Sequence, residues 1–408
     1  MLGLVLTAGG ARGAYQAGVL KRLGEIPALH GRPSPFSVIA GASAGAINGA
    51  MVAASAASLT EGTHKLAELW SDLTASQVFR ADPLALGIGG ARWLRDLSLG
   101  GLIGGGNIQS LLDASPLRDL LAKHLPLDGI ASAIRAGHLY AVAVSATSYH
   151  SGKSFTFIQG RKGHPLWLKS RRVALSVDLT VDHVCASASI PILFSPVQVP
   201  SPEVGECWFG DGGMRLVTPF SPAIRLGASR IFAVGIRCQS SADALSRAEL
   251  RAGEESHGGI GSIARPPLAQ IVGVFLNAIF LDHLDADLDH LLRMNELLTA
   301  NGHANGNGNG TGKRKRRTAA APREPMRPIE PLVVSPSADL AIVAAAFAHK
   351  MPRAVRYLLD GLGTPNAQSA DLMSYLLFDS SYTRALIDIG YQDAHARIDE
   401  IEAFVRRD

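Results

Sequence analysis

The chain has 408 residues, of which 47% are hydrophobic and 18% are charged, so it has the composition of a globular protein with a large core in one or two domains. The formal net charge is +4, but Lys313–Arg317 alone carries +5, so the rest of the chain sums to −1. The basic balance therefore belongs to one segment and says little about the folded surface. Cys185, Cys207 and Cys238 are odd in number and lack metal-ligand spacing, which predicts reduced, buried thiols in a cytoplasmic protein.

The N-terminal elements predict a parallel α/β unit. Leu2–Thr7 is a short apolar run without a basic flank, which is typical of a first strand and not of a secretory signal. It leads into Gly9–Gly13 and a helix, and Phe36–Ala40 then leads into Gly41–Gly45 and a second helix. Strand, glycine-rich turn and helix in succession, twice over, predict a parallel sheet covered on both faces. The uncharged run Val38–Leu59 is long enough to span a bilayer, but its Gly, Ala and Ser residues favour a buried helix.

Later elements are predicted from apolar patterning. The expected strands are His138–Ala146, Ser154–Gln159, Cys207–Phe209, Ile231–Ile236 and Leu332–Val334. The expected helices are Val181–Ile190, Pro219–Leu226, Ala338–Leu362 with a break at Pro352, Ala370–Phe378, Tyr382–Ile389 and Ala394–Arg406.

The composition changes sharply at Asn301–Gly312, which contains only Asn, Gly, His, Ala and Thr and cannot form a core. The sequence therefore predicts a main domain at 1–300, a disordered Asn/Gly-rich and basic linker or insert at 301–330, and a mainly helical segment at 331–408 that packs on the main domain. The cluster Lys313–Arg317 fits a solvated linker, a nucleic-acid patch, or recruitment to an anionic membrane surface. Because aromatic residues do not interleave the cluster, we predict no nucleic-acid partner and hypothesise peripheral contact with the inner face of a membrane.

The motif that organises the chain is Gly41–Gly45, a Gly-x-Ser-x-Gly between a predicted strand and a small-residue helix. This is the pattern of a nucleophile elbow, which exposes a serine at a sharp turn; the alternative is a helix whose small residues pack closely on a sheet. A serine needs a base and donors for the oxyanion. The glycines of Gly9–Gly13 allow backbone N–H groups to converge on an anion, and Gly210–Gly213 places Asp211 on a strand-end loop. Gly9–Gly13 fits neither the phosphate-loop nor the dinucleotide fingerprint.

Four ordered motifs together carry a resemblance. Gly-Gly-x-Arg-Gly at Gly9–Gly13, Gly-Ala-Ser-Ala-Gly at Gly41–Gly45, Ala186–Pro191 followed by Phe194, and Asp-Gly-Gly at Asp211–Gly213 resemble the patatin-like phospholipase family. The resemblance covers Met1 to about Ile236, and the tail around Tyr375–Tyr391 is similar to that of bacterial members.

The resemblance implies a three-layer α/β/α fold with a mostly parallel central sheet, a C-terminal helical extension and a Ser–Asp dyad. Ser43 would be the nucleophile and Asp211 the general base. The Gly9–Gly13 backbone (Gly9, Gly10, Ala11, Arg12, Gly13) would form the oxyanion hole, with Arg12 ordering that loop, while Gly41 and Gly45 shape the elbow and Gly212 and Gly213 the base loop. No metal or organic cofactor is implied, and the partner would be a lipid ester.

The base poses a physical difficulty, because an aspartate with a pKa near 3.9 is poorly matched to a serine unless burial raises that pKa. A Ser–His–Asp triad is the alternative, with His183, His283 or His290 as the histidine, although none of them lies in a motif. His283, Asp287 and His290 also share a helical face, so they could form a metal site; we favour a solvated polar face. The preceding apolar stretch Val272–Leu281 fits a wall of an acyl pocket, a surface that touches lipid, or a plain core helix.

Three functions remain open on this evidence. The favoured one is a phospholipase A or lysophospholipase type of acyl hydrolase, which cleaves fatty-acyl esters through an acyl-enzyme. An acyl transferase is the second, because the elbow also resembles that of malonyl-carrier transacylases. The third is a non-catalytic lipid-binding protein on a former hydrolase scaffold. Oligomeric state, head group and acyl length are not specified by any motif.

Overall fold

The computed structural model describes residues 1–80, 110–201, 205–239, 283–304, 326–353 and 370–407, together with 271, 274, 278, 279, 355 and 356. Most of the predicted linker, including Lys313–Arg317, lies outside these residues, as does nearly all of Val272–Leu281. Within the described ranges, no helix is both long enough and apolar enough to cross a membrane.

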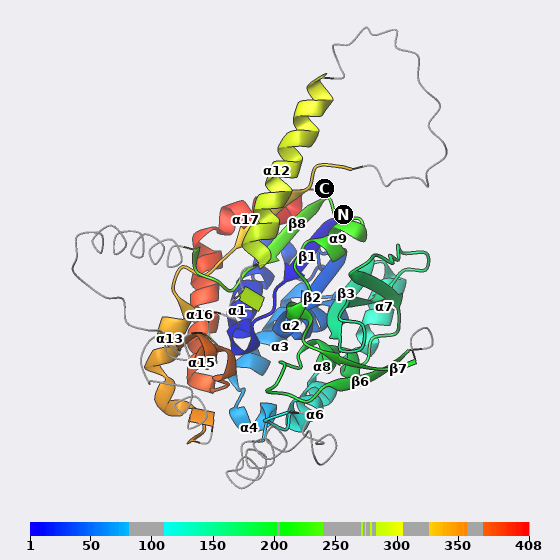
Figure 1. Ribbon diagram of the computed structural model, residues 1–408. Helices are drawn as coiled ribbons and strands as arrows, with labels where there is room; N and C mark the ends of the chain where they lie inside the picture. Colours follow the sequence, from blue (N-terminus) through cyan, green and yellow to red (C-terminus); the bar gives the residue numbers. More distant parts are fainter. Residues whose placement is uncertain are drawn as a thin grey trace, which may run out of the picture.

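A mostly parallel sheet forms the centre of the molecule (Figure 1). Its main path runs β5-β4-β3-β2-β1-β8-β9, and β7 pairs with both β3 and β6 beside that path. The pairs β1–β2, β1–β8, β2–β3, β8–β9 and β4–β5 are parallel, whereas β3–β4, β3–β7 and β6–β7 are antiparallel. The strands are β1 Leu2–Leu6, β2 Val38–Ala42, β3 Ala141–Ser148, β4 Ser154–Gly160, β5 Arg172–Ser176, β6 Val197–Ser201, β7 Gly205–Gly210, β8 Arg230–Val234 and β9 Glu330–Val334.

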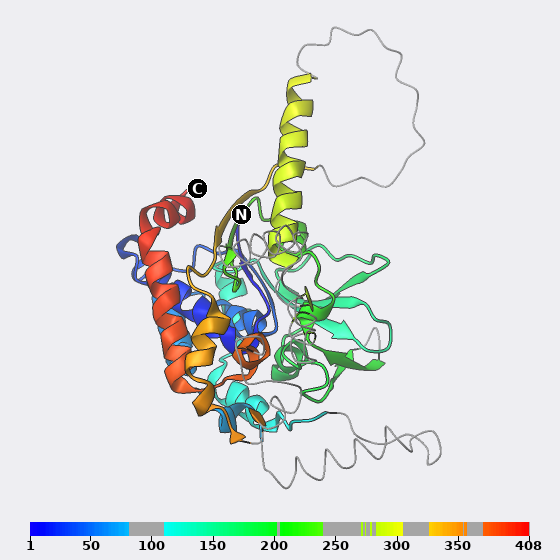
Figure 2. The ribbon, with the colours of Figure 1, turned by 60° about the vertical axis from the view of Figure 1, so that its left-hand side comes forward.

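One face of the sheet carries most of the helices. Alternate strand residues such as Leu4, Ile39 and Val142 point into this larger core because successive side chains point to opposite faces. Helix α16 packs along α1, where a Cβ on Gly18 would overlap the carbonyl oxygen of Ile387 (Figure 2). The helices of this layer and its rim are α1 Gly13–Gly24, α2 Ala44–Ala54, α3 Leu59–Ser71, α4 Ala75–Val78, α6 Ser115–His124, α7 Asp128–Ala136, α8 Val181–Ser187, α13 Leu340–Ala346, α15 Ala370–Leu376, α16 Ser380–Ala396 and α17 Ile398–Arg406.

The opposite face is covered by α9 Ser221–Arg225 and by the base of α12 His283–Ala304, which extends beyond the sheet (Figure 1). Val5, Val38 and Ile231 of the strands form a smaller core there with Phe220 and Leu284. Helices on both faces of a mostly parallel sheet confirm the predicted three-layer α/β/α class.

The structure also corrects several predicted elements. Strands β5 and β6 were not predicted, and the helix expected at Ala338–Leu362 ends at Ala346, before a 3-10 turn at Ala348–Lys350 and well before Pro352. The predicted gap between the helices Tyr382–Ile389 and Ala394–Arg406 is also wrong. Helix α16 continues through residues 390–393 to Ala396, and α17 begins at Ile398. Gly390, in the middle of α16, allows this helix to approach the carbonyl oxygen of Tyr15 closely.

Candidate active site

Ser43 lies at the turn between β2 and α2 with a strained backbone. Its φ of 55° and ψ of −128° fall in a region that residues with a side chain rarely adopt. A Cβ on Gly41 would overlap the carbonyl oxygen of Gly45, and a Cβ on Gly45 would overlap that of Leu6. Close backbone approach on both sides of the serine therefore requires both glycines.

A buried hydrogen-bond chain holds this turn. The Ser43 N–H donates to Ser187 Oγ at 2.9 Å, and that hydroxyl donates to the carbonyl oxygen of Ser145 at 2.5 Å. Ser187 thus joins the start of α2 to β3, which limits the freedom of the serine backbone.

Asp211 follows β7 and is fully buried. Its backbone is fixed on both sides, because its N–H donates to the carbonyl oxygen of Ser189 at 2.8 Å and its own carbonyl oxygen accepts from Thr147 Oγ1 at 2.8 Å. The Gly213 N–H donates to Asp211 Oδ1 at 2.8 Å, while a Cβ on Gly212 would overlap the carbonyl oxygen of Ser145. The loop therefore needs its glycines to place the carboxylate against β3.

Burial raises the pKa of Asp211 to about 7, and the Ser43 hydroxyl and the Gly213 N–H each offset part of that rise. The Ser43 hydroxyl thus favours the ionised carboxylate. Asp211 Oδ2 accepts no hydrogen bond from the described residues. One carboxylate oxygen is thus held in place and the other retains the capacity to take up a proton.

The Gly9–Gly13 loop lies beside the start of α2. It forms a 3-10 turn at Gly10–Arg12, and a Cβ on Gly13 would overlap Ala44 Cβ. The N–H groups of Gly10 and Ala11 begin this turn and donate to no atom of the described residues. Two donors without an internal acceptor therefore lie next to the residue that follows Ser43.

Arg12 is buried and points toward α15, away from an open surface. Its Nη2 forms an ion pair with Asp371 Oδ1 at 2.8 Å, its Nε donates to Ser374 Oγ at 2.7 Å, and its guanidinium lies 4.7 Å from the ring centre of Tyr375. The Tyr375 carbonyl oxygen also occupies the space that a Cβ on Gly10 would need. The C-terminal part of the chain thus holds the loop in place.

An apolar cavity opens beside Ser43. Gly10 and Ala44 line it from the loop and the elbow helix, and Ile47, Ile190 and Phe194 form further parts of its wall. The cavity has a volume of about 40 Å³, and none of the described residues that line it carries a charge, so its walls are suited to contact with hydrocarbon.

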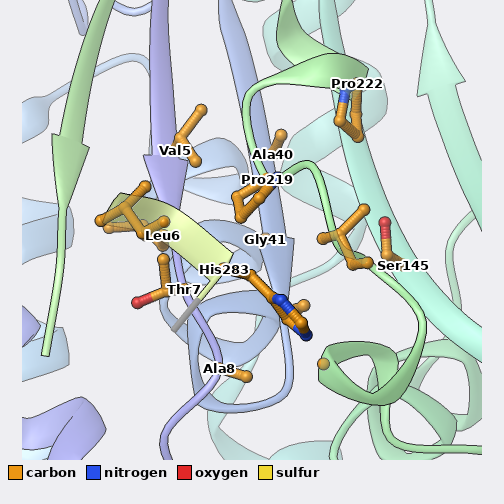
Figure 3. A pocket seen from close by; sticks show the side chains of 14 residues that line it. Val5, Leu6, Thr7, Ala8, Ala40, Gly41, Ser145, Pro219, Pro222 and His283 are labelled. Atoms are coloured by element: carbon orange, nitrogen blue, oxygen red, sulfur yellow. The ribbon is translucent and has the colours of Figure 1, made fainter. Parts of the chain in front are cut away.

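The three histidines considered for a triad lie in different surroundings. His183 Nδ1 accepts from the Thr180 N–H at 3.1 Å, its ring meets Phe157 edge to face at 4.6 Å, and burial lowers its pKa to about 4. His283 projects from α12 into a cavity of about 20 Å³ that it shares with Gly41, behind the elbow (Figure 3). His290 lines a separate pocket on the α9 side.

The structure gives no support for a metal site on α12. In the described part of the chain, no three His, Cys, Asp or Glu side chains lie close enough together to hold a metal ion. Asp287 Oδ2 instead accepts from the Phe220 N–H at 2.9 Å.

Sequence reasoning missed the polar residues that support the two loops. Asn48 Nδ2 donates to the carbonyl oxygen of Gly13 at 3.0 Å, and its Oδ1 accepts from Trp70 Nε1 at 2.7 Å. Gln16 Nε2 donates to the carbonyl oxygen of Thr7 at 2.9 Å. A polar residue inside an otherwise small and apolar helix, such as Asn48 in α2, is the signal that could have revealed this network.

Comparison with known proteins gives one family. The model of the patatin-like phospholipase family matches residues 4–224, more than half of the chain. No curated protein matches. Among solved structures, VipD from Legionella pneumophila is similar with a TM-score of 0.30 and 14% identity, over 66% of this chain and 58% of VipD. Human GIVD cytosolic phospholipase A2, solved with a methyl γ-linolenyl fluorophosphonate inhibitor and terbium chloride, has a TM-score of 0.40 and 12% identity, over 100% of this chain and 59% of the human protein. The chain thus spans less than two thirds of either solved protein.

Proposed function

The chain belongs to the patatin-like phospholipase family, and from this premise we propose that it is a lipid acyl hydrolase that cleaves fatty-acyl esters through Ser43 and Asp211. The observation that carries the proposal is the fully buried Asp211 carboxylate, with a pKa raised to about 7 by burial, next to the hydroxyl of a strained Ser43. A base with this pKa is far better matched to neutral pH than an exposed aspartate.

In the first half of the reaction, Ser43 Oγ attacks the ester carbonyl carbon and its proton passes to Asp211. The carbonyl oxygen becomes an oxyanion, and the Gly10 and Ala11 N–H groups are the donors we assign to it. Each such donor is worth about 2.7–4 kcal/mol in enzymes of this kind. Collapse of the intermediate breaks the ester C–O bond, and the leaving alkoxide takes the proton from Asp211.

In the second half, Asp211 takes a proton from a water molecule that attacks the acyl-enzyme. The same donors hold the second oxyanion, and collapse returns the proton to Ser43 Oγ and releases a fatty acid. The scheme uses one carboxylate as base and then as acid in each half.

The apolar cavity beside Ser43 supports a fatty-acyl chain over a polar acyl group, because its walls are uncharged. Membership of the patatin-like phospholipase family supports a phospholipid or lysophospholipid as the molecule that carries this chain, and these are the substrates we propose. Recruitment to a membrane by Lys313–Arg317 remains a prediction, since that cluster lies outside the described residues.

We also propose that the segment 331–408 acts as a brace for the 1–300 domain. Strand β9 extends the sheet beside β8, and Asp371, Ser374 and Tyr375 all contact Arg12. Because Arg12 belongs to the loop with the two free N–H groups, this brace would keep those donors aimed at the oxyanion.

The proposal is tested with the purified chain, a fluorophosphonate probe and a panel of phospholipid and lysophospholipid vesicles. We expect probe labelling and fatty-acid release by the wild type and by the control Ser71→Ala, which removes a partly exposed serine from the end of α3, and neither from Ser43→Ala. Product analysis with an added alcohol or thiol acceptor separates hydrolysis from acyl transfer. Full labelling of Ser43→Ala, or no release from any lipid by a folded wild type, would overturn the proposal.

A further inference from the structure

A second pocket lies on the opposite face of the sheet, between α9, α12 and the segment that leads into β9. Its volume is about 500 Å³, within the range of roughly 300–1,000 Å³ that small-ligand sites occupy. None of its lining residues belongs to the Ser43, Asp211 or Gly9–Gly13 loops. Any ligand held here is therefore bound separately from the reaction proposed above.

Three arginines line this pocket: Arg172, Arg225 and Arg327. Within the described residues, none of them forms an ion pair with a carboxylate. Burial lowers the pKa of Arg172, and the like charge of Arg225 lowers it further. The negative charge of Asp287 offsets part of this effect, but Asp287 forms no ion pair with Arg172. Two neighbouring positive charges that are only partly balanced favour an anion between them.

The same arginines are fixed in position by neutral groups. Arg172 Nη1 donates to Thr218 Oγ1 at 2.6 Å and to Ser221 Oγ at 2.8 Å. Arg225 lies over the ring of Trp167, with 5.6 Å from its guanidinium carbon to the ring centre, and Arg327 Nη2 donates to the carbonyl oxygen of Ala228 at 3.2 Å. The guanidinium groups are thus ordered while their charge stays unbalanced, so an anion can bind with little loss of side-chain entropy.

Among the described residues that line the pocket, Asp287 is the one acidic side chain. Its carboxylate is held by the Phe220 N–H, and burial raises its pKa, an effect that His290 and Arg172 partly offset. One aspartate against three arginines leaves the pocket positively charged.

The rest of the lining is apolar and runs along α12. Leu291, Met294 and Leu298 follow one another at helical spacing, and Ile224 and Ile329 lie on the other side of the pocket. Eleven residues of helix separate Asp287 from Leu298, a length of about 16 Å at 1.5 Å per residue. The pocket therefore has a basic end and an elongated apolar wall.

We propose that this pocket binds an anionic amphiphile with one hydrocarbon chain. Its oxyanion head group, a carboxylate or a phosphate monoester, contacts Arg172 and Arg225, and its chain lies against Leu291, Met294 and Leu298. Arg guanidinium groups suit both kinds of oxyanion because their paired N–H donors match two oxygen atoms.

The experiment measures binding to the full chain by isothermal titration calorimetry. The probes, used below their micelle concentrations, are laurate, dodecyl phosphate, inorganic phosphate and dodecyltrimethylammonium. The test variants are Arg172→Gln/Arg225→Gln and Leu298→Glu, the second of which keeps both arginines and adds a carboxylate to the apolar wall. The matched control is Arg135→Gln/Arg406→Gln, which removes two arginines from exposed helix ends.

We expect laurate, dodecyl phosphate or both to bind the wild type and the control at this pocket. Each test variant should either lose this one binding site per chain or bind there with about tenfold lower affinity. Laurate alone points to a free fatty acid and dodecyl phosphate alone to a phosphate ester. Equal binding of both amphiphiles by folded test variants and control would overturn the proposal. So would inorganic phosphate or dodecyltrimethylammonium that binds this site as tightly as the anionic amphiphiles.

Discussion

Arg12 and Arg172 lie on opposite faces of the same sheet, and their charges are balanced differently. Arg12 is buried beside the candidate active site and forms an ion pair with Asp371, whereas Arg172 has neutral hydrogen-bond partners and a second arginine nearby. A full cation beside Ser43 would bind a product carboxylate in its ground state. Backbone N–H dipoles instead act most strongly when charge develops on the oxyanion, which is what catalysis requires.

Our two proposals therefore give the two faces different tasks. In these proposals the α1 and α2 face provides an uncharged cavity and a transient anion site, whereas the α9 and α12 face provides a permanent anion site with an apolar wall. We expect substitutions on the first face to change turnover and substitutions on the second to change anion binding only.

The largest contrast is expected from Arg12→Met set against Arg172→Met. The first breaks the contacts with α15 and misplaces the Gly9–Gly13 donors, so kcat should fall by about 10²-fold, the effect of losing one oxyanion donor. The second should leave kcat within about twofold, because Arg172 lines a pocket that includes no residue of the Ser43, Asp211 or Gly9–Gly13 loops. Esterase kinetics with circular dichroism as a folding check measure both, and equal losses would break the comparison.

A stability measurement sharpens the role given to Asp211. Because burial raises its pKa above the unfolded value, ionising it in the folded state opposes folding. The wild type should thus lose stability as the pH rises from about 4 to about 8, by a few kcal/mol at about 1.4 kcal/mol per pKa unit. Asp211→Asn cannot ionise, so its thermal midpoint should exceed that of wild type at pH 8 by more than at pH 4. A difference that is independent of pH would contradict the assignment.

The apolar cavity is tested by Ile47→Trp, which fills it from the elbow helix. Hydrolysis of an octanoyl ester should fall by about tenfold in kcat/KM, while an acetyl ester should lose less than about threefold, as differences of a few methylene groups allow. Leu292→Trp, at an exposed position on α12, is the control. Equal losses with the two esters would show that the cavity does not hold the acyl chain.

The smallest effect is expected from His283→Ala. His283 lies behind the elbow on the α12 side, so kcat should change by less than about threefold, compared with the 10⁴-fold or larger losses that follow removal of a histidine base. His283→Gln is the conservative companion. A loss in both variants comparable to that of Asp211→Asn would favour a triad over the dyad.

The first two strands, the strand–turn–helix at Gly41–Gly45 and a parallel sheet covered on both faces could be predicted from local sequence patterns. Each of these features depends on residues that are close together in the chain. Pairing across long separations was harder to predict. Strand β5 is short and begins with Arg172, and the gap expected between the helices Tyr382–Ile389 and Ala394–Arg406 is filled by α16, which packs on α1. These features depend on neighbours that the local sequence does not specify.

The candidate site shows the same division. Ser43 and Asp211 could be selected from their motifs. The supporting roles of Ser187, Asn48 and Asp371 depend on contacts between segments that are distant in the sequence, so only the structure reveals them. The pKa of Asp211 could not be predicted from the sequence, because it depends on how deeply the carboxylate is buried, and burial is a property of the whole fold.

The most direct test of the Ser43–Asp211 assignment is the rate of fluorophosphonate labelling as a function of pH. The account predicts that wild-type labelling rises with pH with a midpoint near 7, where Asp211 ionises, and that Asp211→Asn labels at a small fraction of that rate without the inflection. An unchanged rate and inflection in Asp211→Asn would contradict it.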